Sequence, residues 1–234
     1  TLTNPNNGCV PLNLFGVGVA SPAAIAYTHG TAYQRSIVKL DVVSADASGT
    51  LFRLPAGDVS VAFGGDYIRN EASSTQDALA LARAYAVQNF QPFYGKRHVK
   101  EAFVETVIPI LKDVPLAQKL ELNAAGRITD YSTSGSVKTW KVGISDQVFK
   151  DLRIRGTLSH DIRAPTLTDL FSGGVLTQQP VFDSATNKTY PQYTNAKGNP
   201  ALRPEEADTA TAGIIFSPSF IPGLQLSVDY YRIN

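Results

Sequence analysis

Several features that the sequence lacks already exclude classes of protein. The chain of 234 residues contains one cysteine, Cys9, so no intrachain disulfide can hold its fold. No run of about 18 apolar residues occurs, which excludes a conventional transmembrane helix. The 21 basic and 20 acidic residues nearly cancel, whereas a nucleic-acid-binding surface is usually strongly basic. With 43% hydrophobic and 18% charged residues, the chain is neither disordered nor a helical membrane protein.

The sequence also lacks methionine and any signal-peptide pattern of basic, apolar and small residues. It opens on polar, asparagine-rich residues and closes within an apparent strand at residues 224–233. We therefore expect the chain to be a piece of a longer protein. A processed mature protein is the alternative.

Apolar and polar residues alternate with a period of two over much of the chain. In the clearest segment, 118–131, one face carries small or apolar side chains and the other carries charges and amides. Leu120, Leu122, Ala124, Gly126 and Ile128 form the first face, and Lys119, Glu121, Asn123, Arg127 and Thr129 form the second. Successive side chains of a strand point to opposite faces, so this alternation predicts half-buried β-strands.

The same pattern predicts about eight strands in an all-β fold. They are residues 35–54, 58–72, 97–111, 116–131, 137–147, 151–161, 207–217 and 223–234. Several are much longer than the usual strand of about five or six residues. A tilted strand needs about nine to eleven residues to cross a bilayer, so these lengths suit a membrane-spanning barrel.

Short turns and long loops alternate between the predicted strands. Tight turns, most of them containing Pro or Gly, lie at residues 54–58, 112–115, 146–150 and 217–223, and longer segments lie at 73–96, 132–136 and 162–206. Short turns at one end and long loops at the other are typical of an outer-membrane barrel. Residues 76–87 favour a helical turn or two. The prolines at 165, 180, 191, 200 and 204 predict irregular structure in the last loop.

A soluble β-sandwich also alternates apolar and polar positions and remains open at this point. Three features favour the transmembrane barrel: the long strands, the alternating loop lengths, and polar faces with several charges in line. Arg153, Arg155 and Asp161 share one face of the strand at 151–161 and suit a water-filled lumen.

Several segments, in collinear order, resemble the barrel of TonB-dependent outer-membrane receptors. Residues 163–171, RAPTLTDLF, are similar to a segment that follows a strand in that family. Residues 198–207, GNPALRPEEA, resemble the segment that opens the next strand. Further matches are CVPLNLFG at 9–16, LPAG at 54–57, the pattern Gly95, Val99, Glu101, Phe103, Glu105, Ile108, Pro109 and Leu111, and VDYY at 228–231.

The resemblance implies a barrel of about 22 strands that is plugged by a separate N-terminal domain. Residues 1–234 are then an antiparallel portion of the barrel wall with long outer loops, and the plug domain and the terminal strand are absent. The implied partners are outer-membrane lipid, the plug, TonB acting through the missing N-terminal region, and a small-molecule ligand. No nucleic acid and no cofactor are expected. The implied location is the outer membrane of a bacterial cell.

Five charged residues are predicted to line the lumen or to contact the plug. They are Glu101, Glu105, Arg153, Arg155 and Arg163. Pro165 lacks an amide donor and restricts Ala164 to extended geometry, so strand pairing ends there and Arg163 is free to turn inward. A solvated loop arginine is the alternative for Arg163.

Aromatic residues of the long loops are the candidate ligand-binding residues. They are Phe90, Phe93, Tyr94, Phe182, Tyr190 and Tyr193. Aromatic faces bind sugars or hydrophobic metal chelates. The alternative is an aromatic girdle at the membrane interface.

No catalytic chemistry is predicted. Ser159, His160 and Asp161 are consecutive strand residues, so His160 faces away from both neighbours and cannot form a triad. Glu101 and Glu105 are separated by about 13 Å along a strand, which is too wide for a glycosidase pair. The three histidines lack the spacing of metal ligands.

The predicted function is therefore TonB-energised import of a scarce nutrient of the siderophore or oligosaccharide class, and not catalysis. A passive porin-like barrel and a soluble carbohydrate-binding β-sandwich are the alternatives.

Overall fold

A computed structural model describes residues 8–86 and 88–234. It divides into two compact units, which are considered separately. The first unit lies within residues 1–37, 73–93 and 172–197, and the second comprises 38–72, 94–171 and 198–234.

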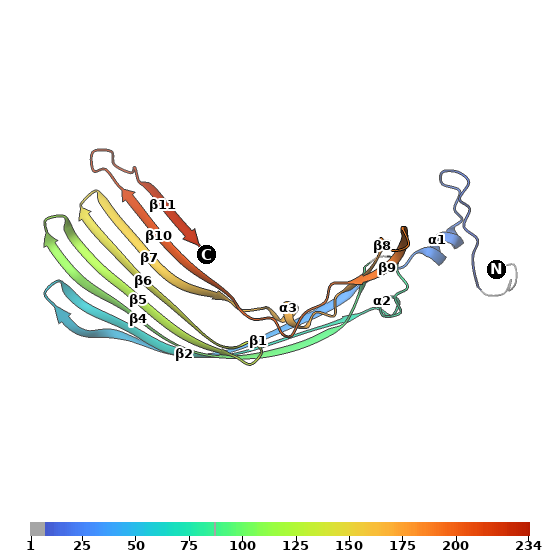
Figure 1. The fold of residues 1–234 in the computed structure, drawn as a ribbon, viewed down its shortest axis with the longest axis horizontal. Coiled ribbons are helices and arrows are strands. Elements are labelled where there is room, and N and C mark those ends of the chain that lie inside the picture. The colour runs from blue at the N-terminus through green and yellow to red at the C-terminus, as the bar shows by residue number, and fades with distance from the viewer. Residues whose placement is uncertain (1–7, 87) are drawn as a thin grey trace. The chain divides into compact units, whose positions relative to one another are not determined.

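Most of the second unit belongs to one sheet of eight strands in the order β1-β2-β4-β5-β6-β7-β10-β11 (Figure 1). The strands are β1 Gln34–Leu54, β2 Gly57–Gln76, β4 Phe93–Val114, β5 Ala117–Tyr131, β6 Gly135–Phe149, β7 Leu152–Arg163, β10 Glu205–Phe216 and β11 Leu226–Ile233. All eight predicted strands are confirmed, with ends that differ by a few residues. From β4 to β11, each strand runs antiparallel to the next.

The strand registers align the apolar positions of neighbouring strands with one another, and likewise the polar positions, as the predicted alternation requires. One row contains Thr106, Ala124, Val142, Leu158 and Ala210 on five successive strands. The face to which this row belongs is called the apolar face. The adjacent row contains Glu105, Ala125, Lys141, Ser159 and Thr209, and its face is called the polar face.

Large side chains of the apolar face remain uncovered. Val142, Leu158 and Ile214 are 42%, 56% and 51% exposed. A β-sandwich would bury this face against a second sheet. A single layer with an exposed apolar face is instead the arrangement expected of a transmembrane barrel wall.

The register shifts by one residue at two places near the short turns, once on β4 and once on β6. The register shifts between Pro109 and Leu111, so Ile110 has no partner on β5. An extra residue of this kind is a β-bulge, which interrupts the strict alternation of the two faces along β4. A second shift between Gln147 and Phe149 lets β6 extend to Phe149. The turn between β6 and β7 therefore lies at residues 150–151, later than the predicted 146–150.

Asp151 joins two neighbouring short turns. Its backbone oxygen accepts a hydrogen bond of 2.8 Å from the Ser217 amide, and its carboxylate accepts from the Ser219 amide at 2.9 Å and hydroxyl at 2.7 Å. Hydrogen bonds from the Ser219 side chain and then from its backbone lower the pKa of the Asp151 carboxyl. The turn after β6 is thus hydrogen-bonded, through Asp151, to the longer turn between β10 and β11.

The contribution of Asp151 to stability is expected to depend on pH. Because its pKa is lowered in the folded protein, the stabilisation is complete above the ordinary value of about 3.9 and is lost as the pH falls through the lower folded value. Asp151→Asn should therefore lower the urea midpoint of the full receptor at pH 7 more than at pH 3. Asp113→Asn, near another short turn, is the control. An equal loss at both pH values would contradict the assignment.

The first unit contains two short helices and a small sheet. Helix α1, Pro22–Thr28, begins after Ser21, whose hydroxyl accepts from the Ala24 amide. Helix α2, Ala78–Leu81, is capped by Asp77 and confirms the helical turn predicted within 76–87. Val87, the last residue of that stretch, lies outside the described residues.

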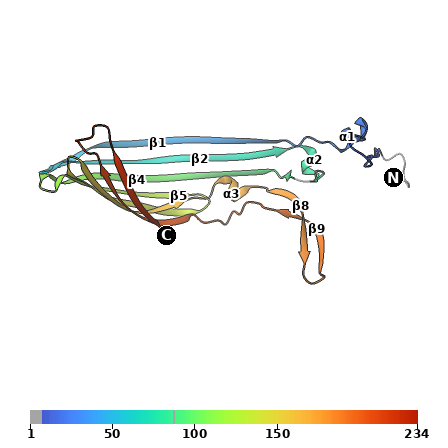
Figure 2. The same cartoon turned by 90° about the horizontal axis from the view of Figure 1, so that it is seen from above.

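The small sheet has the order β3-β8-β9. Its strands are β3 Asn89–Phe90, β8 Val175–Asp183 and β9 Lys188–Asn195, and Figure 2 shows β8 and β9 as a hairpin. The prediction of irregular structure throughout 162–206 was wrong here. Pro180 stands opposite Pro191 in the hairpin. A proline fits an edge strand where its missing N–H would point outward, so both prolines are compatible with pairing.

Helix α3, Leu167–Phe171, lies in the motif that follows β7 and belongs to the second unit. Leu170 is fully buried, and the Arg97 guanidinium donates a 2.6 Å hydrogen bond to the Pro165 carbonyl. A side chain at Gly95 would overlap the Phe171 ring. The absence of a side chain at Gly95 therefore allows α3 to dock on β4.

No helix among the described residues is long and apolar enough to cross a membrane.

Candidate functional site

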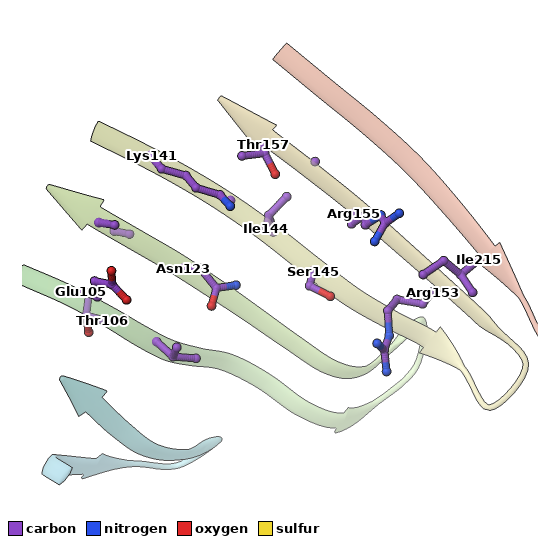
Figure 3. A pocket seen from close by; sticks show the side chains of 15 residues that line it. Glu105, Thr106, Asn123, Lys141, Ile144, Ser145, Arg153, Arg155, Thr157 and Ile215 are labelled. Atoms are coloured by element: carbon purple, nitrogen blue, oxygen red, sulfur yellow. The ribbon is translucent and has the colours of Figure 1, made fainter. Parts of the chain in front are cut away.

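The polar face of the second unit contains a cavity of about 500 Å³ over strands β4 to β10 (Figure 3). Its polar lining comes from alternate positions of adjacent strands. These residues are Glu105 on β4, Asn123 on β5, Lys141 and Ser145 on β6, and Arg153, Arg155 and Thr157 on β7. The period of two of each strand and the antiparallel registers bring them to one side of the sheet.

The cavity carries more positive than negative charge. Within the described part of the chain, Lys141 and Arg153 have no carboxylate at ion-pair distance, and the Arg153 Nε donates to Gln147 Oε1 at 2.9 Å. Glu105 is the one carboxylate in its lining. Such a surface suits a group that presents carboxylate or other anionic oxygens.

Arg155 makes a bidentate ion pair that passes over an intervening strand. Its Nε and Nη2 lie 3.0 and 2.7 Å from Asp229 Oδ1, and Nη2 is 2.8 Å from Oδ2. Arg155 on β7 and Asp229 on β11 are both register partners of Gly213 on β10. A Cβ atom at Gly213 would overlap the Asp229 carboxylate, so glycine at this position is what lets the pair close across β10.

Gly213→Ala is expected to separate Arg155 from Asp229. The carboxylate is the mobile end of a side chain, so it can move away and the fold survives. A double-mutant cycle on Arg155 and Asp229, measured by urea unfolding of the full receptor, should lose its coupling free energy in the Gly213→Ala background. Gly143→Ala is the matched control, because a Cβ there makes only ordinary contacts at 3.5 Å. Unchanged coupling in Gly213→Ala would contradict this account.

Glu101 belongs to a second cluster on the polar face. Its carboxylate accepts hydrogen bonds of 3.2 Å from Arg127 Nη1 and from Thr129 Oγ1. The Arg127 guanidinium also lies over the Phe103 ring, 5.2 Å from its centroid, and Arg97 lies in the same way over Tyr131 at 5.3 Å. Cations stacked on aromatic rings hold these side chains against the sheet.

Arg163 pairs with a carboxylate of the neighbouring strand. Its Nε and Nη2 lie 2.8 and 2.5 Å from the two carboxylate oxygens of Glu205, its register partner on β10. The pair sits where the 162–206 loop leaves and rejoins the sheet. The sequence predicted only that Arg163 lines the lumen or contacts the plug, and it did not identify Glu205 as the partner.

The predicted aromatic residues are distributed over both units. Phe182, Tyr190 and Tyr193 lie on the β8–β9 hairpin and are 61%, 41% and 51% exposed. Phe182 and Tyr193 share one side of the hairpin, whereas Tyr190 faces the other side opposite Val181. Phe90 belongs to the same small sheet, Phe93 begins β4, and Tyr94 falls in the second unit.

Ser159, His160 and Asp161 are arranged as strand geometry requires. The Ser159 hydroxyl lies 2.6 Å from Asp161 Oδ2, whereas His160 Nδ1 lies on the other face, 2.7 Å from Asp208 Oδ1. No group of three or more His, Cys, Asp or Glu side chains in the described part of the chain could hold a metal ion.

Sequence reasoning did not single out Lys141, Ser145 and Thr157 as members of the site. The signal was present, since Lys141, Gly143 and Ser145 alternate with the apolar Val142 and Ile144. The order and register of the strands bring these residues next to Arg153 and Glu105, and the local sequence does not reveal that order.

Comparison with known proteins identifies the family to which this wall belongs. The family model described as "TonB dependent receptor-like, beta-barrel" matches residues 7–234. The chain belongs to this family. A comparison with curated proteins gives no match.

Solved TonB-dependent receptors share the fold. A ferric enterobactin receptor of Pseudomonas aeruginosa, PfeA, solved in complex with enterobactin, is 13% identical over 85% of the chain, with a TM-score of 0.61. The siderophore receptor PirA of Pseudomonas aeruginosa is 17% identical over 86%, with a TM-score of 0.60. The chain covers 27% of the first receptor and 33% of the second. It therefore spans about a quarter to a third of their length.

TonB-dependent receptors are proteins of the bacterial outer membrane, and the chain is assigned to that membrane. Its apolar face is then the lipid-facing side of the wall, and its polar face looks into the lumen.

Proposed function

We propose that this chain is part of the wall of an outer-membrane receptor that imports a scarce nutrient with energy delivered through TonB. The observation that carries the proposal is the cationic cavity on the lumen-facing side of a TonB-dependent receptor wall. The Lys141 and Arg153 side chains face this cavity, and among the described residues neither has a carboxylate at ion-pair distance.

In this proposal residues 1–234 form only part of the barrel, and a plug domain and the terminal strand belong to the rest of the protein. Two facts support it. The sheet has two outer strands, β1 and β11, whose backbone groups need neighbours to close a barrel. The chain also spans only 27% of the PfeA receptor.

Five side chains are proposed to line the lumen or to contact the plug: Glu101, Glu105, Arg153, Arg155 and Arg163. Their shared polar face supports this role. Glu105 and Arg153 have no ion-pair partner in the described part of the chain, so they are the best placed to meet a partner in the lumen. Glu101, Arg155 and Arg163 already form ion pairs within the wall. Their proposed role is to fix the orientation of these partner side chains.

The ligand is proposed to be a siderophore or an oligosaccharide, captured by the long outer loops. The exposed Phe182, Tyr190 and Tyr193 offer flat apolar surfaces that suit either class. Phe90, Phe93 and Tyr94 are proposed to contribute from the other long loop. No catalytic step and no cofactor are assigned to the chain.

Uptake measurements in cells with and without TonB test the function. Cells that produce the full receptor should take up one of two probes, ferric enterobactin or a fluorescent maltooligosaccharide, only when TonB is present. Uptake that is independent of TonB would identify a passive porin-like barrel. Lys141→Ala together with Arg153→Ala should reduce uptake, whereas Lys119→Ala, which removes a lysine paired with Glu121 at 2.8 Å, serves as the charge control.

A further inference from the structure

The β8–β9 hairpin of the first unit (Figure 2) has two faces that differ in chemistry. Side chains alternate along each strand, so the register partners fall into two sets. The set that includes both Phe182 and Tyr193 is called the platform. Its exposed members are Gln178, Pro180, Phe182, Thr189, Pro191 and Tyr193.

The platform places two aromatic rings in line along the hairpin. Tyr193 stands opposite Gln178, and Gln178 precedes Phe182 by four residues on β8, a separation of about 13 Å. The pair formed by Pro180 and Pro191 lies between them on the same face, and neither proline has an N–H group. The two rings are therefore far enough apart to stack on different rings of one ligand, with an apolar floor between them.

The platform is open to solvent beyond its base. Phe182 and Tyr193 are 61% and 51% exposed, whereas Leu176, on the same face where β8 pairs with β3, is 8% exposed. Polar groups stand directly beside the two rings, because Gln178 is the register partner of Tyr193 and Thr189 is that of Phe182. An exposed apolar surface with polar groups at its rim marks an interaction site.

The platform has no charged side chain, and this favours one class of ligand. The two charged residues of the hairpin strands, Asp183 and Lys188, are register partners on the opposite face. The Asp183 carboxylate is also engaged within the turn, where it accepts from the Thr186 hydroxyl at 2.7 Å and from the Ala185 amide at 2.9 Å. An anionic ligand therefore finds no cation on the platform. A neutral ligand with many hydroxyl groups finds aromatic rings with an amide and hydroxyls next to them.

We propose that the platform binds a neutral oligosaccharide. The C–H face of one pyranose ring stacks on Tyr193, and that of another ring stacks on Phe182. The Gln178 amide and the Thr189 hydroxyl exchange hydrogen bonds with sugar hydroxyls beside these rings. This inference rests on the proposed function and narrows its ligand from two classes to one. The lysine and arginines of the wall cavity can also donate hydrogen bonds to hydroxyl oxygens, so a neutral ligand is compatible with that cavity.

The test is calorimetric titration of the full receptor, purified in a detergent without a sugar headgroup, with cellohexaose, xylohexaose and maltohexaose. The wild-type receptor should bind at least one of these neutral sugars. Phe182→Ala and Tyr193→Ala should each weaken that binding about tenfold, because each removes one stacked ring. Gln178→Ala should weaken it about threefold, because it removes one hydrogen bond.

The opposite face of the hairpin supplies matched controls one residue away. Val181→Ala shortens an exposed apolar side chain next to Phe182, and Gln179→Ala removes an exposed amide next to Gln178. Both should leave the affinity unchanged. Every substituted side chain is exposed, so heat-modifiable migration on gels should show that each variant is folded.

Three outcomes would overturn the inference. The first is binding of none of the three sugars. The second is an equal loss of affinity in Gln178→Ala and Gln179→Ala, or in Phe182→Ala and Val181→Ala, which would mean that the platform is not the binding face. The third is that ferric enterobactin alone binds and loses affinity in Phe182→Ala and Tyr193→Ala, which would assign the platform to a siderophore.

The binding experiment is independent of the test of the proposed function, because purified receptor needs no TonB to bind a sugar. TonB-dependent uptake of ferric enterobactin without any sugar binding would contradict this inference and leave the proposed function intact. Sugar binding that depends on Phe182 and Tyr193, together with uptake that is independent of TonB, would contradict only the proposed function.

Discussion

Ala124→Arg is expected to destabilise the folded receptor by about 2–4 kcal/mol, the cost of an arginine near the bilayer midplane on the lipid side of a barrel. Ala124 lies near the middle of β5 on the apolar face, between Thr106 and Val142. Ala125→Arg, one residue later, should cost far less. Ala125 lies on the polar face opposite Glu105, so a new guanidinium there gains a carboxylate partner.

The measurement is the folding equilibrium of the full receptor in lipid vesicles, followed by heat-modifiable migration over a urea series. The two substitutions add the same side chain at neighbouring positions, so helix or strand propensity and size cancel. Equal losses, or a larger loss for Ala125→Arg, would show that the assignment of the two faces is reversed or that the wall does not face lipid.

Leu170→Ala is expected to destabilise the α3 segment by about 2–5 kcal/mol, the range for truncating a buried leucine. Leu170 is fully buried in a helix of five residues, so its side chain supplies much of the apolar contact that holds α3. Such a short helix has little stability of its own. The segment should therefore detach from the sheet while the strands stay paired.

Limited proteolysis of the folded receptor measures this detachment. Leu170→Ala should be cleaved within 164–204 much faster than the wild-type protein, while the strands remain protected. Leu202→Ala is the control, because Leu202 belongs to the same loop and is 38% exposed, so its change should stay within about 0.5 kcal/mol. Equal cleavage of the two variants would mean that Leu170 does not anchor the loop.

The strands of the wall were predictable because each one repeats the same local rule. In 118–131, every second residue is small or apolar, and β5 covers Ala117–Tyr131. The length of such segments and the positions of the short turns then favour a barrel wall over a sandwich. The aromatic residues of the loops were also visible in the sequence, but their distribution over two units was not.

Other features depend on contacts between distant residues and escaped prediction. The β8–β9 hairpin formed despite Pro180 and Pro191, because the two prolines stand opposite each other where neither needs an N–H donor. Helix α3 depends on the docking of Phe171 at Gly95, a residue 76 positions earlier in the chain. Neither contact leaves a periodic trace in the sequence.

What the sequence by itself determined is which side chains share the apolar face and which share the polar face, since a strand assigns its side chains to two faces by their order alone. It also determined the family, through segments such as RAPTLTDLF at 163–171. Only the tertiary structure decided which residues of the polar face meet: Arg155 pairs with Asp229 across Gly213, and Lys141 shares a cavity with Arg153. The physical reason is that the register between strands is set by the pairing of whole strands through backbone hydrogen bonds, and this pairing brings together residues that lie far apart in sequence.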